Sequence, residues 1–139
     1  MSAPIIRHGN WSDNYDDPSH PIPSISALDV HGIKKGGGSD LLIVVASPLQ
    51  ADVRSQQRLL DKIDIYLRYI RSDEYKNKYG APSSDNTCII VRLHAGSDPL
   101  ILDLLERCKP WAAENLCRIE VSPLDEDFPA SSNQRLERP

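Results

Sequence analysis

The stretch LLIVVASPLQADVRSQQRLLDKIDIYLRYIRS, residues 41–72, decides the fold, because an apolar run changes there into a helical repeat. Leu41–Ser47 is apolar without alternation, which is typical of a strand buried on both faces or nearly so. Pro48 ends this strand, and a helix is predicted over Ala51–Ser72. Its apolar arc consists of Val53, Leu59, Leu60, Ile63, Tyr66, Leu67 and Ile70. Because this arc is wider than the stripe of a surface helix, we expect much of the helix circumference to be buried.

A second strand is predicted upstream of this run, over Ile25–Ile33. The connecting residues, Lys34–Ser39, contain Gly36-Gly37-Gly38, and glycine reaches positive φ without steric cost, so an antiparallel hairpin is expected. A phosphate-binding loop would need Gly-Lys-Ser/Thr opening a helix, whereas these glycines lead into a strand.

Downstream of the helix, Asp73–Asn86 is predicted to be a loop, and Thr87–Leu93, rich in β-branched residues, to be a third strand. A second helix is expected to begin at Asp98 as cap and Pro99 as first residue. Pro110 should kink or break this helix near its end. The inward face of the helix consists of Ile101, Leu104, Leu105, Cys108, Trp111 and Ala112. Leu116–Val121 is predicted as the last strand, with Cys117, Ile119 and Val121 inward and Arg118 and Glu120 outward.

The predicted order is β-β-α-β-α-β, which indicates an α/β, two-layer fold. Because each later strand follows a helix, we expect parallel neighbours beside the hairpin, hence a mixed four-stranded sheet with two helices on one face. The other sheet face would be wet, covered by the N-terminal arm, or used for binding. We assign residues 25–121 to a single domain, residues 1–24 to an extended or disordered arm, and residues 122–139 to a flexible tail.

Composition narrows the class of protein. The formal net charge of −4 and the pI of about 5.5 argue against nucleic-acid binding, which depends on clustered Lys and Arg. Three cysteines without close C-x-x-C spacing fit a reducing cytoplasm better than disulfides or a zinc site. The longest apolar run is far shorter than the ~20 residues that span a bilayer. We therefore expect a cytoplasmic protein with no membrane segment, no metal and no cofactor.

Histidine, cysteine and serine side chains at strand ends are the candidates for chemistry. His31 and His94 could share a site, with Ser97 near His94 and Cys88 at the start of a strand. The pattern shows no convergence of these groups, so solvated histidines are the simpler interpretation, and we assign no catalytic residue. Cys108 and Cys117 are predicted to be small buried hydrophobes.

The polar side of the first helix carries two apolar residues, Ile65 and Tyr69, which are i,i+4 neighbours. The N-terminal arm or the loop 73–86 could cover them, or they could form a partner-binding surface with Arg58 and Lys62 in its polar rim. The basic residues of the helix are Arg54, Arg58, Lys62, Arg68 and Arg71. The row formed by the first three is interpreted as a solvated face and not as a nucleic-acid track.

Residues 59–70, LLDKIDIYLRYI, resemble the helix of a family of small bacterial proteins of unknown function. Its members have a strand, a helix of pattern LL-x-K-I-x-x-Y-L-x-(F/Y)-I, a strand and a second helix. The resemblance covers most of Ala27–Val121, and the long N-terminal arm and the acidic C-terminal tail depart from it. The family brings no established activity; the resemblance implies a bacterial accessory protein in which Tyr69 can be part of the fold.

Two hypotheses of function follow. The first is a non-enzymatic protein-binding or accessory module, such as an immunity protein that neutralises a toxin, whose partner is another protein or a second copy of the chain. The second is a small enzyme or ligand-binding domain that uses His31, His94, Cys88 and Ser97.

Overall fold

The computed structural model of the chain describes residues 16–33 and 37–124. Along these residues it contains β1 (Val30–Ile33), β2 (Ser39–Val45), α1 (Val53–Ile70), α2 (Asp73–Tyr79), β3 (Thr87–His94), α3 (Pro99–Glu114) and β4 (Arg118–Leu124). This is an α/β fold, as predicted, with one helix more than expected.

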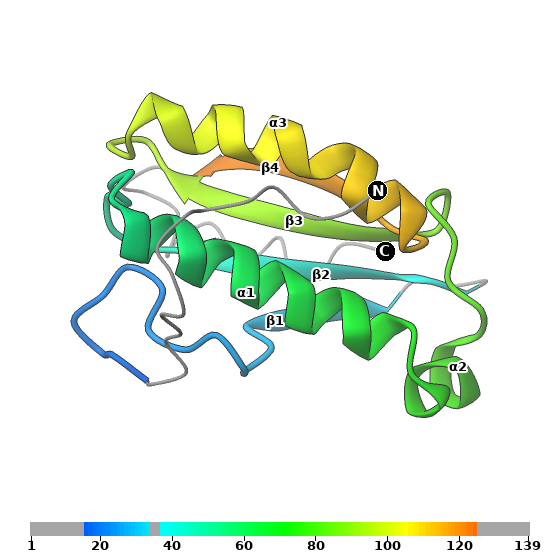
Figure 1. Cartoon of the computed structure of the whole chain (residues 1–139). Helices are drawn as coiled ribbons and strands as arrows, with labels where there is room; N and C mark the ends of the chain where they lie inside the picture. The colour runs from blue at the N-terminus through cyan, green and yellow to red at the C-terminus, as the bar shows by residue number, and fades with distance from the viewer. Residues whose placement is uncertain (1–15, 34–36, 125–139) are drawn as a thin grey trace.

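The strands form one mixed sheet in the order β1-β2-β3-β4. β1 is antiparallel to β2, whereas β2, β3 and β4 run parallel, which confirms the predicted hairpin and crossovers. The long helices α1 and α3 lie side by side on the same face of the sheet (Figure 1). The carboxyl ends of β2, β3 and β4 consequently meet at one edge, beside the start of both helices.

The core lies between this sheet and the two long helices. Leu41, Ile43 and Val45 of β2 are fully buried, while Leu42 and Val44 on the opposite face are half-buried. Burial therefore alternates along β2 although its residues are uniformly apolar, because successive side chains of a strand point to opposite faces.

α1 follows the predicted helical repeat closely. Asp52 caps its first turn by accepting a hydrogen bond from the Ser55 amide, and Arg71 closes its last turn. The predicted apolar arc is buried except at Val53, which is 45% exposed because it lies in the first turn, at the end of the helix.

The prediction of a loop over Asp73–Asn86 is wrong for its first half, which forms α2. Ser72 caps this helix through the Tyr75 amide, and acidic residues occupy its first turn, which suits the helix dipole. Tyr75 is its fully buried side chain. A helix of seven residues with one buried position has too few turns to show a helical repeat, so its capping residue was the available signal.

Of the two effects predicted for Pro110, a kink or a break, the break does not occur, since α3 continues to Glu114. Proline removes one backbone hydrogen bond, and the burial of Trp111 and Ala112 in the core holds the final turn in place. Leu116, with φ 68°, then closes the helix in the left-handed conformation, so β4 starts at Arg118 and not at Leu116 as predicted.

The prediction of a strand from Ile25 onward is wrong, because β1 begins at Val30. The segment before it is irregular and packs on the domain. We call residues 17–29 the strap. Its Ile22 and Ile25 are 1% and 3% exposed and belong to the core. Part of the predicted arm, residues 1–24, is therefore packed, while residues 1–15 and 125–139 lie outside the described residues.

Gly38, directly before β2, is expected to tolerate a side chain poorly. It has φ +93°, and a Cβ there would overlap the backbone carbonyl of Asn86. We expect Gly38→Ala to lower the free energy of unfolding by about 2 kcal/mol, whereas Gly32→Ala should be close to neutral because its nearest neighbour is the Asp40 oxygen at 3.7 Å. Urea unfolding of both variants measures the difference; equal effects would contradict the strain assigned to Gly38.

Candidate functional site

Arg58 of α1, predicted to lie in the rim of a partner surface, is completely buried beneath the strap. Its Nε and Nη2 both donate to the backbone carbonyl of Ile22, at 3.1 Å and 2.6 Å. A guanidinium forks naturally onto one acceptor in this way. Arg58 therefore fixes the strap to the middle of the helix.

Lys62, one turn further along α1, fixes the second half of the strap and is 1% exposed. Its Nζ donates to the backbone carbonyls of Ser24 and Ala27, the latter at 3.1 Å, and to the Asp29 carboxylate at 3.1 Å. These partners use all three donors of an ammonium group. A buried cation is tolerable only when it is hydrogen-bonded in this manner.

The interpretation of Arg54, Arg58 and Lys62 as a solvated row is thus wrong for the last two. Arg54 is the member at the surface, 39% exposed, with its Nη1 2.9 Å from the Asp17 carboxylate at the start of the strap. The charges of Arg58 and Lys62 face backbone carbonyls of the strap, and Lys62 also faces the Asp29 carboxylate. Arg58 and Lys62 are covered while the strap is in place and present no rim to a partner.

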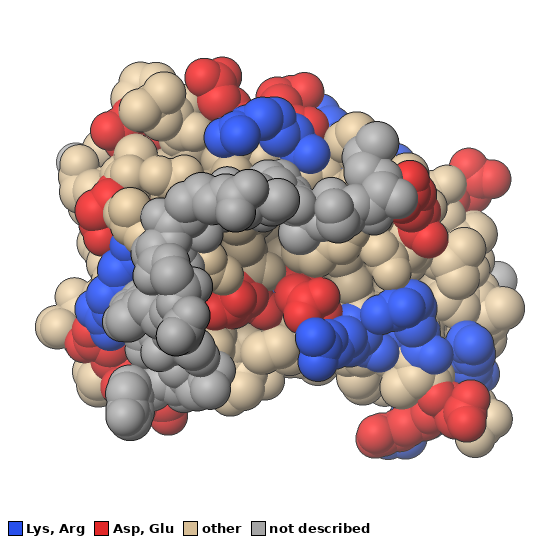
Figure 2. All heavy atoms as spheres, viewed as in Figure 1, with Lys and Arg blue, Asp and Glu red and all other residues tan. Residues whose placement is uncertain are grey.

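Basic side chains elsewhere on α1 do not extend this row into an exposed track. Figure 2 shows Lys and Arg side chains gathered over the C-terminal half of the helix, with acidic side chains close by. Arg68, which is well exposed, pairs with Asp64 at 3.0 Å across one helical turn. The basic residues of α1 are therefore divided between the buried contact with the strap and a surface of mixed charge.

Ile65 and Tyr69 are both half-buried and pack against the core, so they do not form an exposed apolar pair. The Tyr69 ring lies 5.4 Å from the Tyr75 ring of α2, centroid to centroid, and 6.1 Å from His31 of β1. Burial raises the pKa of the Tyr69 hydroxyl. Of the alternatives predicted for this pair, Tyr69 shows cover by the segment 73–86.

His31 lies in an aromatic cluster that the sequence analysis missed. Its Nε2 is 2.8 Å from the Ser39 hydroxyl, which is 2.6 Å from the Tyr75 hydroxyl. Its ring stacks on Tyr75 and meets Tyr79 edge to face at 4.8 Å. Burial lowers the pKa of His31. Ser39 is fully buried, so this hydrogen-bonded chain fixes β1, β2 and α2 together and offers no accessible nucleophile.

The hypothesis of one site containing His31, His94 and Cys88 fails on the sheet register. His31 pairs with Leu41, which pairs with Ile89, so His94 lies roughly 16 Å further along the strand direction. Cys88 precedes Ile89 and points to the opposite face of the sheet. These three side chains cannot act on one substrate.

Cys108 and Cys117 are buried, as the sequence predicts, and the strand-end candidate Cys88 is buried with them. Cys88, Cys108 and Cys117 are fully buried thiols. Burial raises the pKa of Cys108 and of Cys117 to about 12, far above the range of a reactive thiolate.

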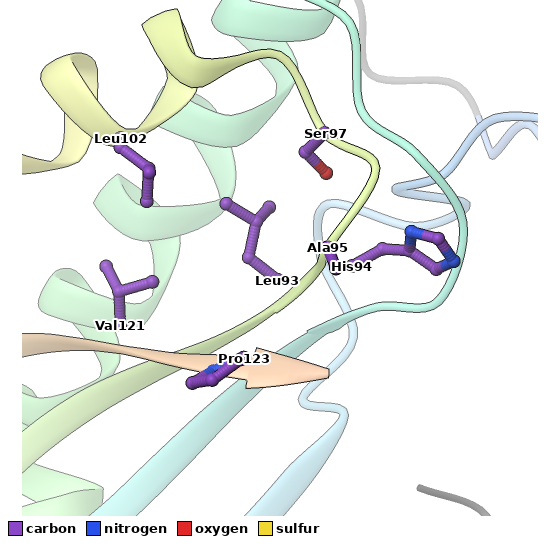
Figure 3. Close-up of a pocket in the computed structure, with 7 residues that line it drawn as sticks. All are labelled: Leu93, His94, Ala95, Ser97, Leu102, Val121 and Pro123. Carbon is purple, nitrogen blue, oxygen red and sulfur yellow. The ribbon is translucent and has the colours of Figure 1, made fainter. Parts of the chain in front are cut away.

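A pocket of about 250 Å³ lies where β3 and β4 end and α3 begins (Figure 3). The side chains of Leu93, Val121 and Leu102, from β3, β4 and α3, converge on it. The remaining lining residues are His94, Ala95, Ser97 and Pro123. The pocket is therefore mainly apolar, and it contains two of the strand-end candidates, His94 and Ser97.

These two polar residues hold the wall of the pocket. The His94 ring points away from the apolar side chains (Figure 3), and its Nδ1 accepts from the Gly96 amide at 2.9 Å, which closes the turn into α3. The Ser97 hydroxyl accepts from the Leu49 amide at 3.0 Å, so its own proton is available as a donor. The site offers an apolar cavity with one hydroxyl at its margin.

Comparisons with known proteins give no indication of function, so the proposal below rests on the geometry of the site. No family model, no curated protein and no solved structure matches the chain. The resemblance to a family of small bacterial proteins thus stays a hypothesis. Across residues 16–33 and 37–124, no group of three His, Cys, Asp or Glu side chains could hold a metal ion. No helix in that part of the chain is long and apolar enough to span a membrane.

Replacement of Lys62 tests whether the strap is held as described. Lys62→Met keeps the length of the side chain but removes the donor to the Ser24 and Ala27 carbonyls and the charge that faces Asp29, so we expect the free energy of unfolding to fall by about 3 kcal/mol. The control is Arg68→Met on the exposed face, which should cost about 0.5 kcal/mol or less. Urea denaturation of each variant provides the comparison. A similar small loss in both would mean that the strap is not held through Lys62.

Proposed function

We propose that this chain is a non-enzymatic protein-binding module that holds an apolar side chain of its partner in the pocket between α3 and the ends of β3 and β4. The observation that carries the proposal is the convergence of Leu93, Leu102 and Val121 on an open cavity of about 250 Å³.

The size of the cavity favours a side chain over a larger molecule. Pockets for drug-sized ligands occupy roughly 300–1,000 Å³, whereas an apolar cavity of about 150 Å³ already holds benzene. The observed volume lies between these limits, so one leucine or phenylalanine side chain fits, with the Ser97 hydroxyl placed to donate to a neighbouring backbone carbonyl of the partner.

The position of the cavity also favours binding. In open α/β sheets, ligands bind outside the carboxyl ends of the parallel strands, and the pocket lies at the carboxyl ends of β3 and β4. Leu102 lines it while remaining 45% exposed, so part of its apolar surface meets solvent and is available to a partner. Burying such an anchor at the centre of a contact is the usual source of affinity.

Charge indicates the chemistry of the partner. Asp98, the N-cap of α3, and Glu106, which pairs with Lys109 at 2.8 Å, lie one helical turn to either side of Leu102, and the whole chain has a net charge of −4. A partner with cationic side chains beside its apolar anchor would be electrostatically complementary. A basic toxin neutralised by an immunity protein has this chemistry, whereas a second copy of the chain has the same acidic charge.

Because all three cysteines are buried thiols, we place this function in the cytoplasm.

Short amidated peptides test the proposal directly. We expect lysine-flanked peptides with a central phenylalanine or leucine to bind about tenfold or more tightly than the same peptide with a central alanine, because the larger side chain fills the cavity. Fluorescence polarisation with labelled peptides measures this ratio, and glutamate-flanked versions should bind more weakly.

Two leucines of α3 give a matched pair of variants. Leu102→Glu places a charge in the pocket and should weaken binding about tenfold or more, whereas Leu100→Glu, at a leucine that is 59% exposed and does not line the pocket, should change affinity less than about twofold. Equal affinity for the alanine and phenylalanine peptides, or equal effects of the two substitutions, would rule the pocket out.

A further inference from the structure

His20 holds the first half of the strap against the start of α1. Its Nδ1 accepts a hydrogen bond from the Ile22 amide at 2.9 Å, and its Nε2 is 2.9 Å from the Ser55 hydroxyl of α1. The surrounding residues form a compact loop, because the Asp17 amide donates to the Pro23 carbonyl at 2.8 Å. His20 thus connects this loop to the helix through both of its ring nitrogens.

This arrangement requires a neutral imidazole. A ring nitrogen that accepts a hydrogen bond cannot carry a proton, and in the neutral ring the other nitrogen is the donor. Nδ1 of His20 is therefore unprotonated, and Nε2–H donates to Ser55. Protonation of Nδ1 would place two N–H groups against each other, so the bond from Ile22 would be lost.

The charges around His20 oppose its protonation as well. Arg54 and Arg58 of α1 face the ring with like charge, while Asp17 of the loop and Asp52 before α1 face it with opposite charge. Both carboxylates are already engaged, Asp17 with Arg54 at 2.9 Å and Asp52 with the Ser55 amide at 3.1 Å. Burial, followed by the charges of Arg58 and Arg54, lowers the pKa of His20 below its ordinary value.

We propose that His20 is a pH-sensitive latch, which keeps residues 17–23 on α1 while its imidazole is neutral and releases them when the ring is protonated. Release would remove the hydrogen bonds of His20 to Ile22 and Ser55, and with them those of Arg58 to the Ile22 carbonyl and the ion pair of Arg54 with Asp17. It would also place a third positive charge beside the two arginines. The second half of the strap, tied by Lys62 and Asp29, would stay in place. Acid would then uncover Ile22 and the guanidinium of Arg58 without unfolding the domain.

The direction of the effect follows from the two protonation equilibria. In the released loop His20 titrates near its ordinary pKa of 6.5, and in the closed loop its pKa is lower. The released form therefore binds more protons, so closure is favoured above about pH 6.5 and is lost progressively as the pH falls through the pKa of the closed form. In this window the opening constant should rise by up to about tenfold per pH unit, since one proton is linked to opening.

Hydrogen exchange of the Ile22 amide, followed by NMR in the full chain, tests the latch. After correction for the intrinsic rate, we expect its protection to decrease as the pH is lowered from about pH 8 to about pH 5, while amides of β2 and β3 stay protected. In His20→Asn an amide oxygen can still accept from Ile22 two residues on, but nothing titrates, so protection should be independent of pH.

The control variant is His94→Asn. His94 makes the same local bond, from the Gly96 amide to Nδ1 at 2.9 Å, but it is the last residue of β3 and does not belong to the strap. Its replacement should leave the pH profile of the Ile22 amide unchanged. In Arg54→Gln the His20 ring signal should titrate at a higher pH than in the natural chain, because a facing positive charge is removed.

Two results would overturn the proposal. One is the same pH dependence of Ile22 protection in the natural chain and in His20→Asn. The other is an Ile22 amide that stays protected while the His20 ring signal titrates. If His20→Asn loses strap protection at all pH values, Arg54→Gln provides the test. In that variant the loss of Ile22 protection should move to higher pH together with the His20 ring signal, and an unmoved loss of protection would overturn the proposal.

Discussion

Backbone carbonyls of the strap meet two buried cations of α1, and much of the arrangement depends on this contact. Arg58 and Lys62 donate to Ile22, Ser24 and Ala27, so an irregular segment is held on a helix without any strand or helix of its own. Desolvating two positive charges costs several kcal/mol each, and hydrogen bonds to carbonyl oxygens offset that cost. The contact also brings Ile22 and Ile25 into the core.

This contact bears on function because it leaves α1 covered on two sides, so that little of the helix surface is open to a partner. One side packs on the sheet, and the side that would otherwise be polar receives the strap and, at Tyr69, the aromatic cluster around Tyr75. At the sheet edge where β3 and β4 end, Leu102 and Val121 converge on the pocket, and Leu102 is 45% exposed within the described residues. The proposed partner site therefore lies at the strand ends and not on the helix that defines the fold.

β2, α1 and α3 were predictable because each leaves a local trace: the apolar run of β2, the repeat of α1, and the cap and proline that begin α3. The short helix α2, with Tyr75 as its buried residue, was not predicted. The strap left no such trace. Periodicity assigns Arg58 and Lys62 to solvent because both are cations, whereas their partners are backbone carbonyls, which every residue possesses. Predicting the pocket would have required the strand register, which pairs Leu93 with Pro123. The sequence alone therefore identified His94 and Ser97 as candidates but not the apolar side chains beside them.

Amide chemical-shift mapping with the lysine-flanked phenylalanine peptide tests the central claim most directly, since it compares the two possible partner surfaces in one experiment. The account predicts that the shifted amides lie in residues 93–97, at Leu102 and in residues 121–123, with the strap unchanged. Largest shifts at Ile65 and Tyr69, or across the strap, would place the partner on α1 and contradict it.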